Sequence, residues 1–307
     1  VHLRNLAIDR DLKMNEYGVF DVSDLDTGET DQRAGRRIGG ATEAEMYDAL
    51  DLPFVPPELR EDRGEIEAAA AGDLPALLAG EDVRGDLHTH TDWSDGTESV
   101  GTMVAAAADR GDDYLGITDH ATGPGMVGGV GLDDDDLREQ MDAVAAAAED
   151  AAVEVFHGVE ANVDADGDLS VGDAVLAELD LVIASPHSGL GQDPEAATER
   201  LVAAVEHPET DILGHPTGRL INDRPGLDPD LDRLISAAAA ADTALEVNAN
   251  PHRLDLNDGA IRAAVDAGAT IAINTDAHAP AELDNRRYGV HTARRGWAER
   301  DDTLNAR

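Results

Sequence analysis

Cysteine is absent from this sequence, aromatic residues are scarce, and lysine occurs once, as Lys13. Without cysteine the chain can form neither a disulfide nor a thiolate metal site. Aromatic residues make up only 3% of the 307 residues, so the core must be built from alanine, valine, leucine and isoleucine. No run reaches the roughly 20 apolar residues of a membrane span, and residues 1–30 lack the pattern of a secretion signal. We therefore expect a cytoplasmic protein with no membrane partner.

Basic residues are also few: 65 acidic residues stand against 23 basic ones, for a formal net charge of -42. Such a surface would repel itself at low ionic strength, whereas at 1 M salt the screening length falls to about 3 Å. We interpret the charge as that of a protein from a salt-accumulating halophile, with an ordinary acidic protein as the alternative. The charge excludes a broad basic face, so any contact with nucleic acid would depend on local arginines and bound metal.

From residue 83 onward, short β-prone runs that end in polar residues alternate with alanine-rich segments of helical periodicity. The runs are 83–90, 114–120, 153–160, 180–187, 211–216, 243–250 and 270–278, and the helical segments lie near 98–110, 134–150, 171–178, 195–206, 228–241 and 257–268. This alternation is typical of a parallel sheet in an α/β fold. Seven units of this kind favour closure, so we predict a distorted (β/α)7 barrel.

Residues 1–62 follow a different pattern, which predicts a small α+β segment in front of the barrel. The stretch 42–50 predicts a short helix with Thr42 as its N-cap, and 53-PFVPPELRED-62 predicts a connector stiffened by proline. An alanine-rich helix near 64–79 is expected to lead into the barrel as part of a linker at 63–82. The barrel domain is expected at 83–307.

Every one of the seven runs ends in a residue that could bind a metal ion or in an amide. His88 and His90 lie on one side of the first strand because side chains alternate along a strand. Asp95 follows just beyond the turn, and the other runs add His120, Glu160, His187, His215, Asp276 and His278. A single histidine of this kind is more often a core or surface residue, but strand ends of a barrel meet on one face. The number of nitrogen and oxygen ligands indicates two or three ions.

Six motifs in this order resemble those of the polymerase and histidinol phosphatase (PHP) family. They are H-x-H at 88–90, 117-ITDH-120, 158-GVEANV-163, 184-ASPHSG-189, 214-GHPTGR-219 and 274-NTDAH-278. Within that family, 215-HPTGRLI-221, 294-RRGW-297 and the front segment resemble the C-terminal PHP domain of bacterial and archaeal family X DNA polymerases. Residues 1–62 would then be a remnant of the polymerase thumb, and the barrel would be of the PHP type. The palm carboxylates would lie upstream of Val1, so polymerase activity is not expected from this chain alone.

The resemblance implies three metal sites. The first would be held by His88, His90, Glu160 and Asp276, the second by Glu160 as a bridge with His187 and His215, and the third by Asp95, His120 and His278. Some members of the family have histidine where Asp95 stands, which weakens the third site or favours Mn²⁺ there. We expect two or three divalent ions, Mn²⁺, Zn²⁺ or Fe²⁺, and catalytic roles for Glu160, Asp276 and His278. Closely spaced metals activate water and neutralise phosphoryl charge, which predicts phosphoester hydrolysis.

Three further residues are candidates for binding the substrate. Arg219 and Arg253 follow the fifth and sixth strands and could hold a phosphate with a planar fork of donors. Salt bridges on an acidic surface are the alternative for both. Asn248, with Asn250 beside it, would orient water or substrate, or close a turn.

Three other patterns are better explained by structure than by function. The loop 123-GPGMVG-128 matches a dinucleotide-binding pattern, but its proline favours a loop at the mouth of the site. The acidic stretch 164-DADGD-168 predicts a hairpin turn and lacks the glutamate of a calcium loop. The run 133-DDDD-136 predicts a helix start, where carboxylates favour the helix dipole.

The sequence supports three hypotheses about function. The first is a metal-dependent phosphoesterase acting on DNA 3′ ends in repair, as an exonuclease, as a 3′-phosphatase or as both. The second is a small-molecule phosphomonoesterase acting on a substrate such as histidinol phosphate or a nucleotide. The third is a non-catalytic PHP scaffold for a polymerase, which does not need so complete a set of ligands. Under the first and third hypotheses an upstream polymerase portion is an expected partner.

Overall fold

The computed structural model describes residues 1–25, 31–123 and 130–307, which form two compact units, Val1–Ala76 and Leu77–Arg307. The first unit contains an antiparallel sheet with strand order β1-β2-β3. Its elements are α1 (His2–Ile8), β1 (Leu12–Asn15), β2 (Gly18–Asp21), β3 (Arg36–Gly39), α2 (Glu43–Asp48), a 3-10 turn at Pro57–Leu59 and α3 (Glu65–Ala71). Thr42 caps α2 as predicted, because its hydroxyl accepts a hydrogen bond from the Glu45 amide at 3.3 Å.

The helix predicted near 64–79 is shorter than expected. The observed helix α3 ends at Ala71, because Gly72 follows in the left-handed conformation with φ of 81°. Pro75 comes soon after and prevents the helix from resuming. Leu77 already belongs to the second unit, where it forms a β-bridge with Glu299. The segment between helix and barrel is therefore largely extended rather than helical.

The second unit is a barrel of seven parallel strands that neighbour one another in chain order, from β4 to β10. The strands are β4 (Gly85–Asp86), β5 (Tyr114–Ile117), β6 (Glu154–Asn162), β7 (Leu181–Ser185), β8 (Ile212–Leu213), β9 (Ala244–Asn248) and β10 (Ile271–Asn274). Each strand pairs in parallel with the next. The predicted (β/α)7 barrel is confirmed.

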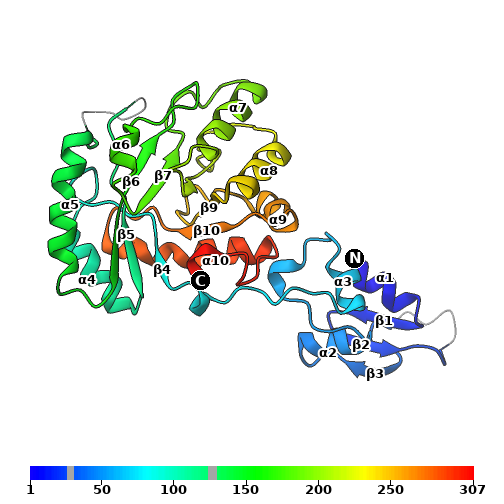
Figure 1. Ribbon diagram of the computed structural model, residues 1–307. Helices are drawn as coiled ribbons and strands as arrows, with labels where there is room; N and C mark the ends of the chain where they lie inside the picture. The colour runs from blue at the N-terminus through cyan, green and yellow to red at the C-terminus, as the bar shows by residue number, and fades with distance from the viewer. Residues whose placement is uncertain (26–30, 124–129) are drawn as a thin grey trace. The chain divides into compact units, whose positions relative to one another are not determined.

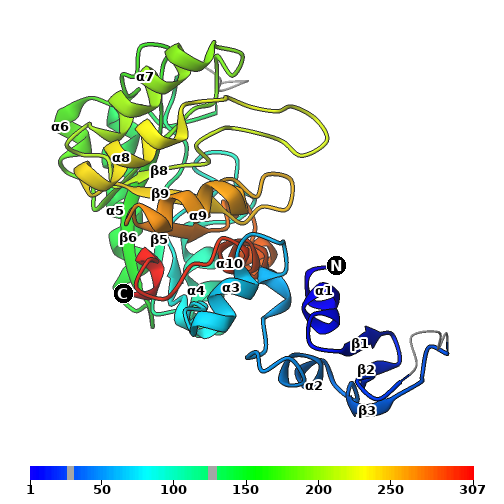
Figure 2. The same ribbon diagram turned by 90° about the vertical axis from the view of Figure 1, so that its right-hand side faces the viewer.

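Helices lie around the outside of these strands (Figures 1 and 2). They are α4 (Val100–Arg110), α5 (Asp134–Ala148), α6 (Asp173–Leu176), α7 (Pro194–Val205), α8 (Leu231–Ala241), α9 (Asp258–Asp266) and α10 (Arg286–Arg295), with 3-10 turns η2 (Gly80–Asp82), η3 (Pro280–Asn285) and η4 (Leu304–Ala306). Asp133 caps α5 in a capping box with Asp136, so the acidic run begins a helix as predicted. Among the residues described, no helix has both the length and the apolar character needed to cross a membrane.

The barrel interior changes character along the strands. At the end where the strands begin, Leu87, Leu181, Ile183, Ile212, Ala244 and Ala272 form a buried apolar cluster. On β9, Leu245 and Val247 pack outward against the helices, so the alternation of side chains points Glu246 and Asn248 inward. Carboxylates, amides and imidazoles therefore fill the other end of the barrel. The apolar cluster is the floor beneath them.

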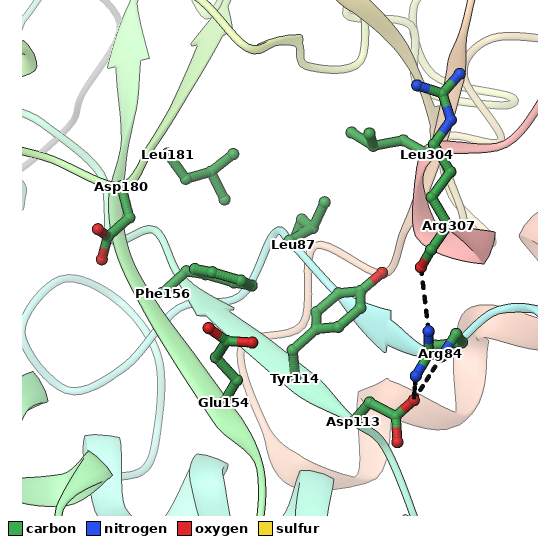
Figure 3. A pocket seen from close by; sticks show the side chains of 10 residues that line it. All are labelled: Arg84, Leu87, Asp113, Tyr114, Glu154, Phe156, Asp180, Leu181, Leu304 and Arg307. Carbon is green, nitrogen blue, oxygen red and sulfur yellow. Dashed lines mark hydrogen bonds and ion pairs between the residues drawn. The ribbon is translucent and has the colours of Figure 1, made fainter.

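A cavity of about 410 Å³ opens where the strands begin, below this floor. Figure 3 shows its lining, in which Leu87, Phe156, Tyr114 and Leu304 are accompanied by charged residues such as Arg84. Arg84 is paired with Asp113. None of the predicted site residues lines this cavity, because all of them lie at the opposite ends of the strands.

The seam between the first and last strands is closed mainly by side chains. The backbone contributes a bridge between Thr89 and Ala277. Asn305, in the 3-10 turn η4, donates to the Gly85 carbonyl at 3.2 Å and accepts from the Ile273 amide at 2.6 Å. Asn305 is fully buried. Its carboxamide thus replaces part of a missing hydrogen-bond ladder between β4 and β10.

Several arginines are directed into the protein rather than toward solvent. Arg200 is only 1% exposed and donates to the carbonyls of Ser188 at 2.8 Å and Val163 at 2.5 Å. Arg294 donates to the Leu78 carbonyl at 2.7 Å. These arginine side chains stabilise the segments whose backbone carbonyls they bond, because a guanidinium can satisfy two or more carbonyls at once.

We predict that Asn305→Ala lowers the free energy of unfolding by about 1–3 kcal/mol, because a buried backbone amide and a buried carbonyl lose their partner. Denaturant unfolding followed by circular dichroism would measure the change. Asn5→Ala, at an exposed position of α1, is a control for loss of an exposed amide. A destabilisation no larger than about 0.5 kcal/mol, the usual range for surface changes, would show that the seam does not depend on Asn305.

Candidate metal centre

The nine predicted ligands converge at the carboxyl ends of the barrel strands. His88 and His90 follow β4, His120 follows β5, Glu160 lies within β6, and His187 and His215 follow β7 and β8; Asp276 and His278 follow β10, and Asp95 lies beyond the turn after His90. Their ligand atoms form three groups, and within each group the atoms lie within 4.8 Å of one another. Burial of most of these residues removes competing water.

Glu160 is the centre of this cluster. Its carboxylate lies 2.6 Å from Nδ1 of His120 and 2.8 Å from Nε2 of His215. Nε2 of His187 is 3.2 Å away, and Nε2 of His88 is 3.4 Å away. The side chain is completely buried, so its two oxygens are presented only to these neighbours. A carboxylate in this position can bridge two ions.

The grouping of the ligands differs in part from the sets implied by the family resemblance. The three groups are His88, His90 and Asp276; His120, Glu160 and His187; and His90, Asp95, His120 and His278. His90 and His120 thus belong to two groups each, because each of these two imidazoles lies between neighbouring groups. His215 joins the cluster through its contact with Glu160. The assignment of ligands to individual ions therefore stays a prediction.

The chemistry of the cluster fits divalent cations. Among the described residues, buried nitrogen atoms of His88, His90, His120, His187 and His215 and Oε2 of Glu160 are not in hydrogen-bonding geometry with any partner, although Nδ1 of His120 and Oε2 of Glu160 lie 2.6 Å apart. Unsatisfied buried polar atoms are costly, and a coordinated ion removes that cost. Donor sets that contain only nitrogen and oxygen suit ions such as Mn²⁺, Zn²⁺ and Fe²⁺.

Electrostatics prepare part of the cluster for binding cations. Burial would raise the pKa of Glu160, but the imidazoles of His187, His120 and His88 hold that pKa well below its ordinary value. Burial lowers the pKa of His215 to about 4, which keeps this imidazole neutral. For His278, burial is outweighed by the hydrogen bond with Asp95, and the pKa is raised to about 9. A metal bound beside Asp95 must therefore displace a proton.

A second layer of carboxylates and amides orients the ligands, and the sequence did not reveal it. Glu246, buried on β9, lies 2.7 Å from Nδ1 of His88 and accepts from the His215 amide at 2.6 Å. Because Nδ1 of His88 is bonded, its Nε2 faces Glu160. The sequence feature that could have indicated this role is a glutamate placed between Leu245 and Val247. Both of these apolar residues face the helices, so Glu246 faces the barrel interior.

Asp119 has a similar role for the turn that carries Asp95. Its buried carboxylate accepts from the Thr91 amide at 2.7 Å and from the Ser94 hydroxyl at 2.5 Å. Gln140, on α5, donates to the same carboxylate at 2.6 Å. The turn from strand β4 is thus held against α5 by charge-assisted hydrogen bonds.

The predicted substrate-binding residues differ from one another in the structure. Arg253 is 17% exposed and lies beside the cluster, with Nε 3.4 Å from Asp276. Asn248 is buried and donates to Asp276 at 3.1 Å and to Glu246 at 3.2 Å, while its oxygen accepts from the Asn250 amide. Its polar atoms are thus bonded within the protein, which suits a positioning role, and its predicted contact with substrate stays a prediction.

Arg219 also points away from a direct substrate contact. Its Nε donates to the Arg253 carbonyl at 2.8 Å, and its Nη2 donates to the Leu254 carbonyl. These bonds engage two of the three nitrogens of the fork that was predicted to hold a phosphate. The predicted hairpin at 164–168 forms, with the Asp164 side chain accepting from three following amides. The glycine-rich loop at 123–128 lies outside the described residues except for Gly123.

Comparison with protein families agrees with this geometry. Residues 86–250 match the PHP domain, and residues 1–61 match the DNA polymerase beta thumb. The chain belongs to the PHP family. This family consists of metal-dependent phosphoesterases, so the predicted reaction class, phosphoric ester hydrolysis, is confirmed at that level.

Individual relatives match different lengths of this PHP protein. The DNA polymerase/3′-5′ exonuclease PolX of Bacillus subtilis (strain 168) is 40% identical over 308 residues, which cover 100% of this chain and 52% of that protein. The chain thus spans about half the length of this relative. A "probable phosphatase" of Caldanaerobacter subterraneus subsp. tengcongensis is 30% identical over 207 residues, covering 63% of this chain and 75% of the other.

Solved structures support the fold of the PHP unit. A Listeria monocytogenes protein, named as a candidate histidinol phosphatase, superposes with a TM-score of 0.50 at 14% identity. The match covers 65% of this chain and 97% of the other. At this identity the likeness concerns the barrel alone.

We predict that Glu246→Gln weakens metal binding by about 10- to 100-fold, the usual effect of changing a residue that orients a metal ligand. Glutamine keeps the shape of the side chain. One of the two carboxylate oxygens, however, becomes an NH2 group, which cannot accept from the donors around Glu246. Competition with a chelator, followed by mass spectrometry of bound metal, would measure the loss. Glu154→Gln, at the opposite end of the barrel, is the matched control. Equal metal affinity in both variants would contradict the orienting role of Glu246.

Proposed function

We propose that this PHP phosphoesterase hydrolyses phosphate esters at DNA 3′ ends in repair, as a 3′-5′ exonuclease, as a 3′-phosphatase or as both. The observation that carries the proposal is the buried Glu160 with its surrounding imidazoles, next to the arginine Arg253 at the cluster. The thumb-like residues 1–61 favour DNA over a small ester. The name of the Bacillus subtilis relative, a polymerase and 3′-5′ exonuclease, points to the same substrate.

In this proposal each part of the cluster has a distinct task. The metal sites are the three sets expected from the family, with His88, His90, Glu160 and Asp276 in the first, Glu160, His187 and His215 in the second, and Asp95, His120 and His278 in the third. Bound divalent ions, Mn²⁺ or Zn²⁺ or Fe²⁺, would activate water and neutralise phosphoryl charge. Glu160, Asp276 and His278 would be the catalytic residues that hold these groups in line with the phosphorus atom.

The protein itself supplies positioning and charge. Nη1 of Arg253 would donate to a non-bridging phosphate oxygen, which a planar guanidinium does well. Asn248 and Arg253 both contact Oδ2 of Asp276, which leaves Oδ1 turned toward His90 at 3.1 Å. These contacts fix Asp276 before substrate arrives, so little reorganisation is needed during the reaction.

The wider context is also a proposal. We assign residues 1–62 to a thumb-like remnant, 63–82 to a linker and 83–307 to the PHP domain. The protein would work in the cytoplasm of a salt-accumulating organism, since its charge of -42 suits high ionic strength. A separate or upstream polymerase portion would be a partner in repair.

A small-molecule phosphomonoesterase is the second candidate. It is favoured by relatives named as probable phosphatases, of whose length this chain matches 75% and 89%. Histidinol phosphate or a nucleotide would then be the substrate. A non-catalytic scaffold is disfavoured, because a domain without activity has no need of so complete a ligand set.

The two candidates can be separated by a direct comparison of substrates. We expect cleavage of 3′-recessed DNA, or release of phosphate from a DNA 3′-phosphate, to exceed hydrolysis of histidinol phosphate by at least about tenfold in kcat/KM, or about 1.4 kcal/mol. The assay would be run in molar KCl with Mn²⁺, and Asp276→Asn would serve as the inactive control. A preference for histidinol phosphate would instead support the second candidate.

We also predict that Glu160→Gln lowers kcat by about 10³-fold or more, whereas Asp95→Asn lowers it by about tenfold. Glu160 contacts imidazoles of two or more sites, while the imidazoles that Asp95 contacts, those of His120 and His278, share one site. Loss of a group that serves several metals removes several kcal/mol of transition-state stabilisation. Single-turnover rates at saturating Mn²⁺ would test this, and equal losses in the two variants would count against a bridging role for Glu160.

A further inference from the structure

Two loops beside the metal centre hold each other through reciprocal hydrogen bonds. One loop, 214–226, follows β8, and the other, 249–257, follows β9. Arg219 from the first loop bonds to the backbone of the second, and Asp255 from the second loop bonds to the backbone of the first. We call this pair, Arg219 and Asp255, the loop clasp.

Arg219 fixes the backbone on which Arg253 is carried. Its Nε donates to the carbonyl of Arg253 itself at 2.8 Å, and its Nη2 donates to the next carbonyl, that of Leu254. Two parallel bonds from a planar guanidinium restrain both position and orientation. The Ile221 amide adds a backbone bond of 2.7 Å to the His252 carbonyl.

Asp255 fixes the loop that follows the ligand His215. Its Oδ2 accepts from the Thr217 amide, the Thr217 hydroxyl and the Gly218 amide, each at 3.0 Å. Asp255 is 1% exposed, so these bonds are made away from water and are correspondingly strong. Gly218 has a φ of 63°, which turns its amide toward the carboxylate.

In the part of the chain that the structure describes, one buried donor of Arg253 has no partner. The side chain is 17% exposed and its Nε lies 3.4 Å from Oδ2 of Asp276. Its Nη1 is buried and has no hydrogen-bond partner among the residues that the structure describes. A buried guanidinium donor without an acceptor is costly, and a phosphate oxygen bound at the neighbouring metal centre would remove that cost.

We propose that Arg219 and Asp255 are positioning residues that hold Arg253 in the orientation needed to bind a phosphate oxygen, and that Arg219 does not contact the substrate. The proposal rests on the phosphoesterase function above but not on DNA as the substrate. A long side chain on an unrestrained loop loses rotamer freedom when it binds a ligand. Because the loop clasp restrains Arg253 during folding, this loss of rotamer freedom does not weaken phosphate binding.

The test is a double-mutant cycle with Arg219→Met and Arg253→Met in the metal-loaded protein. The readouts are the Kd for inorganic phosphate by calorimetry, the KM and kcat for a phosphate ester, and the bound metal. We expect Arg219→Met to raise Kd and KM by about 3- to 10-fold, the cost of ordering one long side chain, with kcat and metal content little changed. In the Arg253→Met background the same change should raise Kd by less than about twofold, since residues acting through one another are not additive.

Further variants keep the cycle decisive. Arg219→Lys, which retains a donor, and Asp255→Asn, which retains an acceptor, should each weaken phosphate binding less than Arg219→Met and Asp255→Ala. Arg233→Met is the control, because Arg233 pairs with Glu195 and Glu199 on the surface of α7 and α8. An equal loss from Arg219→Met in both backgrounds, or loss of bound metal in that variant, would overturn the proposal. If the cycle behaves as expected but DNA is not cleaved, the clasp stands and the DNA assignment fails.

Discussion

The organisation of this protein depends on one buried carboxylate. Glu160 is inaccessible to water and is surrounded by imidazoles from several different strands. An ionised carboxylate in such a place is tolerated only if positive charge or strong hydrogen bonds surround it. The histidines supply part of that compensation, and a bound divalent ion would supply more. The barrel is thus arranged so that the ends of β4, β5, β7 and β8 each deliver an imidazole to this carboxylate.

The floor beneath this point is as important as the ligands. The apolar cluster of Leu181, Ile183 and Ile212 closes the barrel below the site and keeps water from entering there. Glu246, Asn248 and Asn274 form the layer between the floor and the ligands, and they are bonded to one another. Each layer fixes the one above it. Catalytic geometry in this fold therefore begins with hydrophobic packing and proceeds through amides to the metal ligands.

The sequence predicted those parts of the molecule that are encoded locally. Alternation of strands and helices gave the barrel, and H-x-H at 88–90 with the other strand-end motifs located the metal centre. It did not predict the roles of Glu246 and Asp119, because their partners come from distant strands and helices. Arg219 was assigned to the substrate since an arginine at a strand end resembles a phosphate ligand. Only the three-dimensional contacts distinguish a guanidinium that faces a ligand from one that faces a neighbouring loop.

The inward-facing arginines alter how this molecule meets other charged molecules. Arg200, Arg219 and Arg294 are bonded to carbonyl groups of the chain, so they add little to the outward-facing positive charge, and 65 acidic residues already outnumber 23 basic ones. For most enzymes that act on polyanions, long-range attraction speeds the encounter and added salt slows it. For this protein, with a net charge of -42, the long-range force on any polyanion would be repulsive. Salt screens such a repulsion, so the rate of association with a polyanion should rise with ionic strength.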